Sequence, residues 1–367
     1  MNEKIKYLFI IFIILFFIIN IFNFATIYRY NTLVNGSYFK SFLSDIIDVN
    51  NTRRISIEVD INPVSSHRNA GPIAFIKGIN EFLPYSNKYC EFIPSKNISI
   101  ESTKNEVDYF YMSLPRLNEK QLDEWINTNN SNRLLLGPNF VPSNWFKFPQ
   151  QNYWKEKNFP KYLEKVKAMV VHSDRVRNHL AEKSNSTSLL HKFINMRACT
   201  NLKPNNKIKS FKERPIDILY YEKYADLDHS KQGEELYGLL NKTDKNIVKM
   251  NYGGYDKKKM IEWANDSKFI IYFSFFDTGA IGLKEIQNHG VYAFTIQADL
   301  VNDNSTIFYI PELAEEDGIK TAFKKIMEKI EMITKENPDT ELVVKKNYDS
   351  NNCQMALDDL CKGIVNS

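Results

Sequence analysis

Two acidic residues, Asp277 and Glu285, are separated by seven residues in the segment FSFFDTGAIGLKEIQNHGVYAFT, residues 273–295. If a helix begins between them, eight steps of about 100° bring the second acid within roughly 80° of the direction of the first. Carboxylates accept hydrogen bonds from hydroxyl groups. One acid could therefore contact a sugar while the other contacts the hydroxyl pair of a ribose.

The turn between the two acids consists of Thr278, Gly279 and Ala280. Small residues leave backbone N–H groups open at the start of a helix, where unpaired donors and the helix dipole attract phosphate. A diphosphate could thus lie between the acids. The same pattern also suits an ordinary strand–turn–helix unit in which Asp277 caps the helix and Glu285 lies on the surface.

The neighbouring residues predict the elements that position this turn. KFIIYFS (268–274) is short, continuous, aromatic and β-branched, which predicts a buried strand. Residues 279–289 predict a helix, Gly290 a left-handed cap, and VYAFT (291–295) the next strand. Asp277 then follows the carboxyl end of a strand, at the edge of an open α/β sheet where ligands bind.

Segments typical of strands and helices alternate along the rest of the chain, which predicts parallel sheets. Before residue 200, we expect strands at 54–61, 107–114, 133–137 and 168–173, and helices at 73–83 and at 174–184, the latter starting at an acidic cap. The polar, basic stretch 201–214 contains a Pro and predicts an interdomain linker. After it, we expect strands at 216–222 and 246–251, and helices at 231–242, 257–266, 315–336 and 351–364.

These segments predict an α/β protein with two Rossmann-like parallel-sheet domains, an N-terminal one at 55–205 and a C-terminal one at 206–367. The run that precedes them, from Tyr7 to Tyr28, is apolar and has the length of about 20 residues that spans a bilayer. A cleaved signal peptide is the alternative, although its apolar core is usually shorter and ends in small residues. We expect residues 1–29 to be a cytosolic tail and transmembrane helix, and 30–54 a polar stem.

Glycosylation sequons favour a luminal body, in a single-pass type II orientation in the endoplasmic reticulum or Golgi. They begin at Asn35, Asn50, Asn97, Asn129, Asn185, Asn241, Asn265 and Asn304. The chain has four cysteines, Cys90, Cys199, Cys353 and Cys361, which permit disulfides without demanding them. If Cys353 and Cys361 share one helix, they lie beyond the limit of about 7 Å between Cα atoms and cannot bridge to each other.

Other features exclude several classes of function. The formal net charge of +4 is mild and comes with no basic block, so a nucleic-acid binder is not indicated. No Gly-x-Ser-x-Gly elbow or Cys–His signature supports a hydrolase. Asp226 and Asp228 imitate a metal-binding DxD motif, but their place after a strand favours a loop over a magnesium site. We expect no metal and no cofactor.

The acid–turn–acid segment resembles the E-x7-E segment of retaining GT-B glycosyltransferases, especially family 4. That pattern is a strand, a Ser, an acid, a Gly-containing turn, a second acid and a Gly–Val return, matched here by Ser274, Asp277, Gly279, Glu285, Gly290 and Val291. The chain departs from it in two ways: the first acid is Asp instead of Glu, and no Pro follows the turn.

Three further segments resemble the same family in order. Residues 167–180 resemble its strand–Ser–helix segment at the end of the first domain. Residues 218–236 resemble the first strand and helix of its second domain, where two basic residues face the donor diphosphate; the matching positions are Lys223 and Lys231. By composition alone, these are as readily solvated lysines. HRNAGP (67–72) resembles the glycine loop of the acceptor domain.

The resemblance implies a membrane-anchored glycosyltransferase that moves a sugar from a nucleotide-diphosphate donor to a hydroxyl of a glycan, lipid or protein, with retention and without a metal. It implies catalytic roles for Asp277 and Glu285. Donor binding falls to Lys223, Lys231, Thr278, Gly279 and Ala280, and the acceptor-side loop contributes His67 and Gly71. The alternative function is a catalytically degenerate GT-B domain that binds a glycan or a protein partner.

Overall fold

The computed structural model describes residues 54–61, 70–95, 107–112, 119–138, 159–200, 207–223, 227–251, 256–274, 279–300, 306–315, 317–350 and 352–366. The expected transmembrane run from Tyr7 to Tyr28 lies outside these residues, as do the stem and His67. Among the helices within the described ranges, none has both the length and the apolar character needed to cross a bilayer.

A seven-stranded sheet forms the first half of the described chain. Its strands are β1 (Ile55–Asp60), β2 (Tyr85–Ser86), β3 (Cys90–Ser95), β4 (Val107–Tyr111), β5 (Leu134–Leu136), β6 (Ala168–Val171) and β7 (Phe193–Asn195). They run in the order β2-β3-β1-β4-β5-β6-β7, and every pair is parallel except β2 with β3. The central strands are buried on both faces, as parallel strands covered by helices must be.

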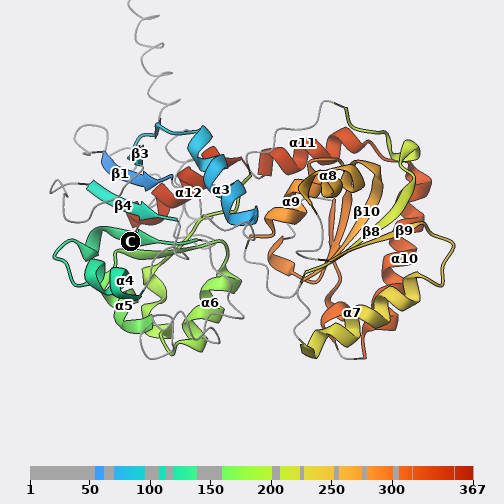
Figure 1. Ribbon diagram of the computed structural model, residues 1–367, viewed down its shortest axis with the longest axis horizontal. Coiled ribbons are helices and arrows are strands. Elements are labelled where there is room, and N and C mark those ends of the chain that lie inside the picture. The colour runs from blue at the N-terminus through green and yellow to red at the C-terminus, as the bar shows by residue number, and fades with distance from the viewer. Residues whose placement is uncertain are drawn as a thin grey trace, which may run out of the picture. The chain divides into compact units, whose positions relative to one another are not determined.

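Helices cover both faces of this sheet (Figure 1). On one face, α3 (Ala70–Glu81) and the C-terminal helix α12 (Cys353–Asn366) share an apolar core with β1, β3 and β4. On the other face, the helices are α4 (Glu119–Ile126), α5 (Phe159–Lys165) and α6 (Asp174–Lys183). Because α12 comes last in the sequence but packs on the first sheet, the end of the chain belongs to the core of the first half.

The second sheet is wholly parallel and has five strands, in the order β12-β11-β10-β8-β9. They are β8 (Ile216–Glu222), β9 (Ile247–Asn251), β10 (Ser267–Phe273), β11 (Tyr292–Thr295) and β12 (Ile307–Tyr309). Helices α7 (Leu227–Leu240) and α10 (Ile319–Glu336) pack on one face of this sheet. Helices α8 (Lys257–Asp266) and α9 (Ile281–Gln287) pack on the other, and α11 (Thr340–Ser350) packs against α9.

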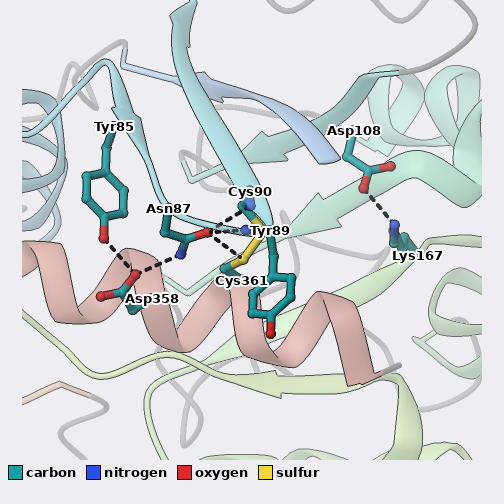
Figure 2. Close-up of a disulfide and its surroundings, with 8 residues drawn as sticks. All are labelled: Tyr85, Asn87, Tyr89, Cys90, Asp108, Lys167, Asp358 and Cys361. Carbon is teal, nitrogen blue, oxygen red and sulfur yellow. Dashed lines mark hydrogen bonds and ion pairs between the residues drawn. A yellow bond between two sulfur atoms is a disulfide. The ribbon is translucent and has the colours of Figure 1, made fainter. Parts of the chain in front are cut away.

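Two disulfides tie α12 to the first half. Cys90, at the start of β3, bonds to Cys361, and Cys199, which follows β7, bonds to Cys353. Figure 2 shows the first of them, with Asn87 and Asp358 beside it. Cys353 and Cys361 do share one helix, and each of them pairs with a cysteine elsewhere in the chain. The partners are far apart in sequence, by 271 and 154 residues, which is why spacing alone left the pairing open.

The predicted α/β class with two parallel-sheet domains is confirmed. Most of the expected strands match to within a few residues, and Gly290 has the predicted left-handed conformation, with φ of +79°. The expected boundary at 205/206 falls between β7 and β8, but α12 departs from that division because its apolar face is buried on the first sheet.

Two local expectations were wrong. Helix α6 is capped by Ser173, whose side chain accepts from the N–H of Val176, while Asp174 lies in the first turn. The helix expected at 73–83 begins earlier, because Gly71 and Pro72, expected in the glycine loop, lie in the first turn of α3. A Pro is tolerated there, since the first turn of a helix needs no N–H from it.

Candidate functional site

The order of the second sheet reverses at β8, which lies between β9 and β10. The chain leaves β8 toward α7 on one face, and it leaves β10 toward α9 on the opposite face (Figure 1). In open α/β sheets, ligands bind outside the carboxyl ends of the strands at such a reversal. Lys223 lies at this point, and its N–H donates to the carbonyl oxygen of Phe273 across 3.0 Å.

Glu285 is a buried carboxylate beside this reversal, with 5% of its surface exposed. It lies in α9 and pairs with Lys257, the first residue of α8. Burial raises the pKa of Glu285 above its ordinary value, and the charges of Lys257 and Lys223 act in the opposite direction. The interpretation of Glu285 as a surface residue is therefore wrong. A buried carboxylate needs such a cation, because an unpaired buried charge is costly.

The two lysines expected at the donor diphosphate differ in their surroundings. Lys223 is close enough to Glu285 to lower the pKa of that carboxyl. Lys231 is exposed in α7, and no contact places it beside Glu285 within the described residues. Helix α7 approaches the strand ends closely at Gly233, where a Cβ atom would lie 3.0 Å from a carboxylate oxygen of Glu222.

The turn before α9 is only partly described, since Asp277 and Thr278 lie outside the described residues. Ala280 is the N-cap of α9 and has a left-handed backbone, with φ of +45°. A residue with a side chain adopts this conformation at a cost of about 1–3 kcal/mol, and it persists where the surroundings hold it. Here Ala280 is fully buried, so packing fixes the turn.

Gly279 brings this turn against the first half of the chain. A Cβ atom at Gly279 would lie 2.9 Å from the imidazole of His172 and 3.0 Å from the Cβ of Ala198, so a larger residue would force one of them to shift. The Nδ1 atom of His172 lies 3.0 Å from the carbonyl oxygen of Met196. A carbonyl can only accept, and Nδ1 therefore carries the proton. His172, Met196 and Ala198 follow β6 and β7, at the carboxyl edge of the first sheet.

A second link between the two carboxyl edges runs through Gln297, which follows β11. Its amide nitrogen donates to the carbonyl oxygen of Ser274 at 2.6 Å, and its amide oxygen accepts from Arg175 of α6 at 2.9 Å. Gln297 is 2% exposed, and its bond to Ser274 is buried while its bond to Arg175 is partly buried. The end of β10, from which the acid–turn–acid segment continues, is thereby joined to the first half.

Sequence reasoning missed three of these residues: Lys257, Arg175 and Gln297. Lys257 is the first of three consecutive lysines, and only its position directly after the N-cap Asp256 distinguishes it. The long-range pairing of Arg175 with Gln297 leaves no local pattern in the sequence.

Of the acceptor-side residues, Gly71 lies in α3, and the predicted role of His67 stays a prediction. Within the described residues, no group of three or more His, Cys, Asp or Glu side chains is arranged to hold a metal ion.

Comparison with known proteins adds a distant likeness in fold. No protein-family model matches the chain, and no curated protein sequence is similar to it. The catalytic domain of starch synthase IV from Arabidopsis thaliana, bound to ADP and acarbose, is 9% identical, with a TM-score of 0.49 over 86% of this chain and 100% of that one. The lipopolysaccharide outer core galactosyltransferase WaaB is 8% identical, with a TM-score of 0.47 over 86% and 99%.

A third neighbour is TarM of S. aureus, in complex with fondaparinux, alpha-GlcNAc-glycerol and UDP. It is 12% identical, with a TM-score of 0.46 over 67% of this chain. The likeness spans only 53% of the length of TarM. These neighbours are GT-B glycosyltransferases, the class that the acid–turn–acid segment resembles. At such identities the likeness concerns the fold alone, and the function of this chain has to come from its own site.

Replacing Lys257 with Met should lower the free energy of unfolding at pH 8 by about 1.5–3 kcal/mol, the usual contribution of a hydrogen bond to a charged group. Without its cation, Glu285 has a still higher pKa in the folded state and an unchanged one in the unfolded state. The loss should therefore grow as pH rises through the pKa of Glu285 and be small at pH 4, where the carboxyl is protonated.

Urea unfolding of both proteins at pH 4 and pH 8 measures this difference. The control is Lys258→Met, which removes an exposed lysine from the next position of α8. Equal losses for the two variants, or a loss that does not change with pH, would contradict the pairing of Lys257 with Glu285.

Proposed function

We propose that this protein is a glycosyltransferase that takes its sugar from a nucleotide-diphosphate donor held at the carboxyl edge of the second sheet. The acceptor is a hydroxyl group of a glycan, a lipid or a protein. In this proposal the transfer retains the configuration at the reacting carbon and uses no metal ion.

The observation that carries the proposal is the buried Glu285 at the reversal of strand order, with Lys257 and Lys223 as its cations. A carboxylate accepts both hydroxyls of a ribose, and a lysine supplies a point charge to a diphosphate. The reversal brings both kinds of group to the place where a doubly wound sheet binds a nucleotide. A stability role alone does not require a carboxylate there, since apolar residues fill such positions at lower cost.

The remaining donor contacts extend from the same place. In the proposal, Lys223 and Lys231 neutralise the leaving diphosphate, together with the turn at Thr278, Gly279 and Ala280. Asp277 contacts the sugar near its reacting carbon. The acceptor approaches from the first half, where His67 and Gly71 lie. Gly279 supports this arrangement, because it packs against His172 of the first half and so brings the turn to the carboxyl edges of both sheets.

Replacing Lys223 with Met should weaken the binding of nucleoside diphosphates about tenfold or more, because a charge-assisted hydrogen bond contributes roughly 1.5–3 kcal/mol. The affinity for the matching nucleoside, which lacks phosphate, should change less than twofold. Isothermal titration calorimetry with UDP, GDP and ADP and their nucleosides measures both.

The control for this experiment is Lys242→Met, which removes an exposed lysine beyond the far end of α7 and should leave both affinities unchanged. If Lys223→Met weakens the diphosphate and the nucleoside equally, or weakens neither, Lys223 does not bind the phosphates.

Substitutions of the two acids should change different kinetic constants. The ribose does not change its charge during transfer, so Glu285→Gln should raise the KM for the donor more than it lowers kcat. The sugar gains positive charge in the transition state, and a nearby carboxylate stabilises it. Asp277→Asn should therefore lower kcat by roughly 10²–10³-fold, if it matches the loss of one preorganised electrostatic contact, and leave the KM nearly unchanged.

Steady-state rates, with the nucleotide sugar that most raises the Tm of the wild type, measure this separation. If both variants keep wild-type kcat and KM, the assignment of the acids is wrong. If the wild type binds a nucleotide sugar but turns over none of the acceptors offered, the chain is the binding module that a degenerate GT-B domain would be.

For its location, we propose a type II membrane protein with its body in the lumen of the endoplasmic reticulum or Golgi. The two disulfides support an oxidising compartment. Treating the protein from a eukaryotic host with an N-glycosidase should increase its gel mobility, because used sequons carry bulky glycans. An unchanged mobility, together with digestion of the body by protease added outside intact microsomes, would place the body in the cytosol.

A further inference from the structure

Helix α9, which carries Glu285, is bound to the rest of the protein through Lys284. The side chain of Lys284 donates to the carbonyl oxygen of Ala198, after β7 in the first half, at 2.9 Å. The carbonyl oxygen of Lys284 accepts from the side-chain amide of Asn347 in α11, also at 2.9 Å. The same amide of Asn347 donates to the side-chain oxygen of Asn288 at 2.5 Å, so α11 holds the C-terminal end of α9 at two points.

A disulfide connects these two supports of α9. Ala198 is followed directly by Cys199, and Asn347 is followed six residues later by Cys353. Cys199 and Cys353 are bonded, with their Cα atoms 5.1 Å apart. One closed ring therefore runs through α9. It consists of the Cys199–Cys353 disulfide, the chain from 347 to 353 and the two bonds of Lys284.

Apart from this ring, α9 is held by the pairing of Glu285 with Lys257 and by apolar packing. The helix has seven residues, too few to be stable alone. Its residue Ile281 packs in the core of the first half, while Leu283 and Ile286 pack in the core of the second. A shift of α11 away from the first half would pull on Lys284, the neighbour of Glu285 in the chain. The disulfide prevents that shift, because it joins both supports covalently.

We propose that the Cys199–Cys353 disulfide is a positioning device for the donor site: it holds α9 between the two halves, through Lys284 and Asn347, and so fixes the place of Glu285. This proposal rests on the proposed function for its effect on the donor. Its mechanical part, the restraint of α9, stands without that function.

The other disulfide provides a matched control, since it also joins α12 to the first half. Its hydrogen-bonding neighbours, Asn87 and Asp358, lie beside it (Figure 2). Asn87 accepts from the N–H of Cys90 at 2.8 Å and donates to Asp358 at 2.8 Å, and Asp358 also accepts from the hydroxyl of Tyr85 at 2.7 Å. None of these bonds involves α9 or α11. Removing Cys90–Cys361 therefore costs stability in α12 without opening the ring.

Loss of the Cys199–Cys353 bond should release the first turn of α12, and with it the chain back to Asn347, while the later turns of α12 stay attached to the first half. The guanidinium of Arg197 binds the carboxylate of Asp359 through two bonds, at 2.6 and 3.1 Å. The Cys90–Cys361 disulfide also remains. The double variant Cys199→Ala/Cys353→Ala should therefore fold, and it can be compared with Cys90→Ala/Cys361→Ala at a temperature well below both values of Tm.

Hydrogen exchange of the backbone amides in residues 281–287 tests the mechanical part. In Cys199→Ala/Cys353→Ala, these amides should exchange at least tenfold faster than in the wild type, while those of α7 exchange as before. In Cys90→Ala/Cys361→Ala, the amides of α9 should keep wild-type rates.

Calorimetry with the tightest-binding nucleoside diphosphate tests the effect on the donor. The Kd of this nucleoside diphosphate should rise five- to tenfold in the first variant and less than twofold in the second.

Lys284→Met tests the same ring without touching a cysteine, and it keeps most of the apolar stem. It should raise the Kd and the exchange rate of α9 as the first variant does. The triple variant Cys199→Ala/Cys353→Ala/Lys284→Met should raise the Kd and the exchange rate little further than either change alone, because both changes open the same ring.

Three results would overturn the proposal: unchanged exchange in α9 on loss of Cys199–Cys353, the same effect from both disulfides, or additive effects of Lys284→Met. If the wild type binds no nucleoside diphosphate, the proposed function fails, and the exchange rates alone decide whether the ring restrains α9.

Discussion

The burial of one carboxylate, Glu285, is the constraint on which the rest of the site depends. A charged group that is 5% exposed must be offset by a cation, and Lys257 takes that place at the start of α8. This pairing fixes α8 against α9, on one face of the second sheet. Lys223 then adds a second cation from the end of β8. In the proposed function, this acid and its two cations would bind a ligand that carries both hydroxyls and phosphate.

The two halves are built alike, and in the proposed function this likeness would let one protein bring two substrates together. In each sheet a central strand, β1 or β8, lies where the order reverses, so each carboxyl edge has a position for a ligand. Contacts between the halves involve residues that follow strands, such as His172 after β6 and Gln297 after β11. A donor at the second edge and an acceptor at the first would thus lie next to one another. Hydrogen bonds such as Arg175–Gln297 and Lys284–Ala198, together with the packing of Ile281 in the core of the first half, join the two edges.

The sequence predicted β8, β9, β10 and α8 of the second half to within one residue, because buried parallel strands such as β10 are continuous apolar runs and α8 has a clear N-cap. It also placed the acid–turn–acid segment at the edge of a sheet. The strands β7 and β12, with three residues each, escaped it, and so did the longer β3 and α11. The return of α12 to the first sheet escaped as well, since the apolar face of an amphipathic helix does not say which core it will join.

What the sequence could not reveal about the site is its long-range pairing. Nothing in three consecutive lysines indicates that Lys257 is the one that reaches Glu285. The surface position first considered for Glu285 follows from its residue type, since Glu is rarely buried, and the structure overrides that preference with a cation. The pairing of Cys199 with Cys353 likewise depends on the fold and not on spacing.

A crystal structure of the protein with the nucleoside diphosphate that raises its Tm most would show whether a nucleotide binds at the β8–β10 reversal. We expect the ribose hydroxyls on the carboxylate of Glu285 and the diphosphate between Lys223 and the turn at 277–280. A nucleotide bound at the first sheet instead, or a ribose with no contact to Glu285, would contradict this expectation.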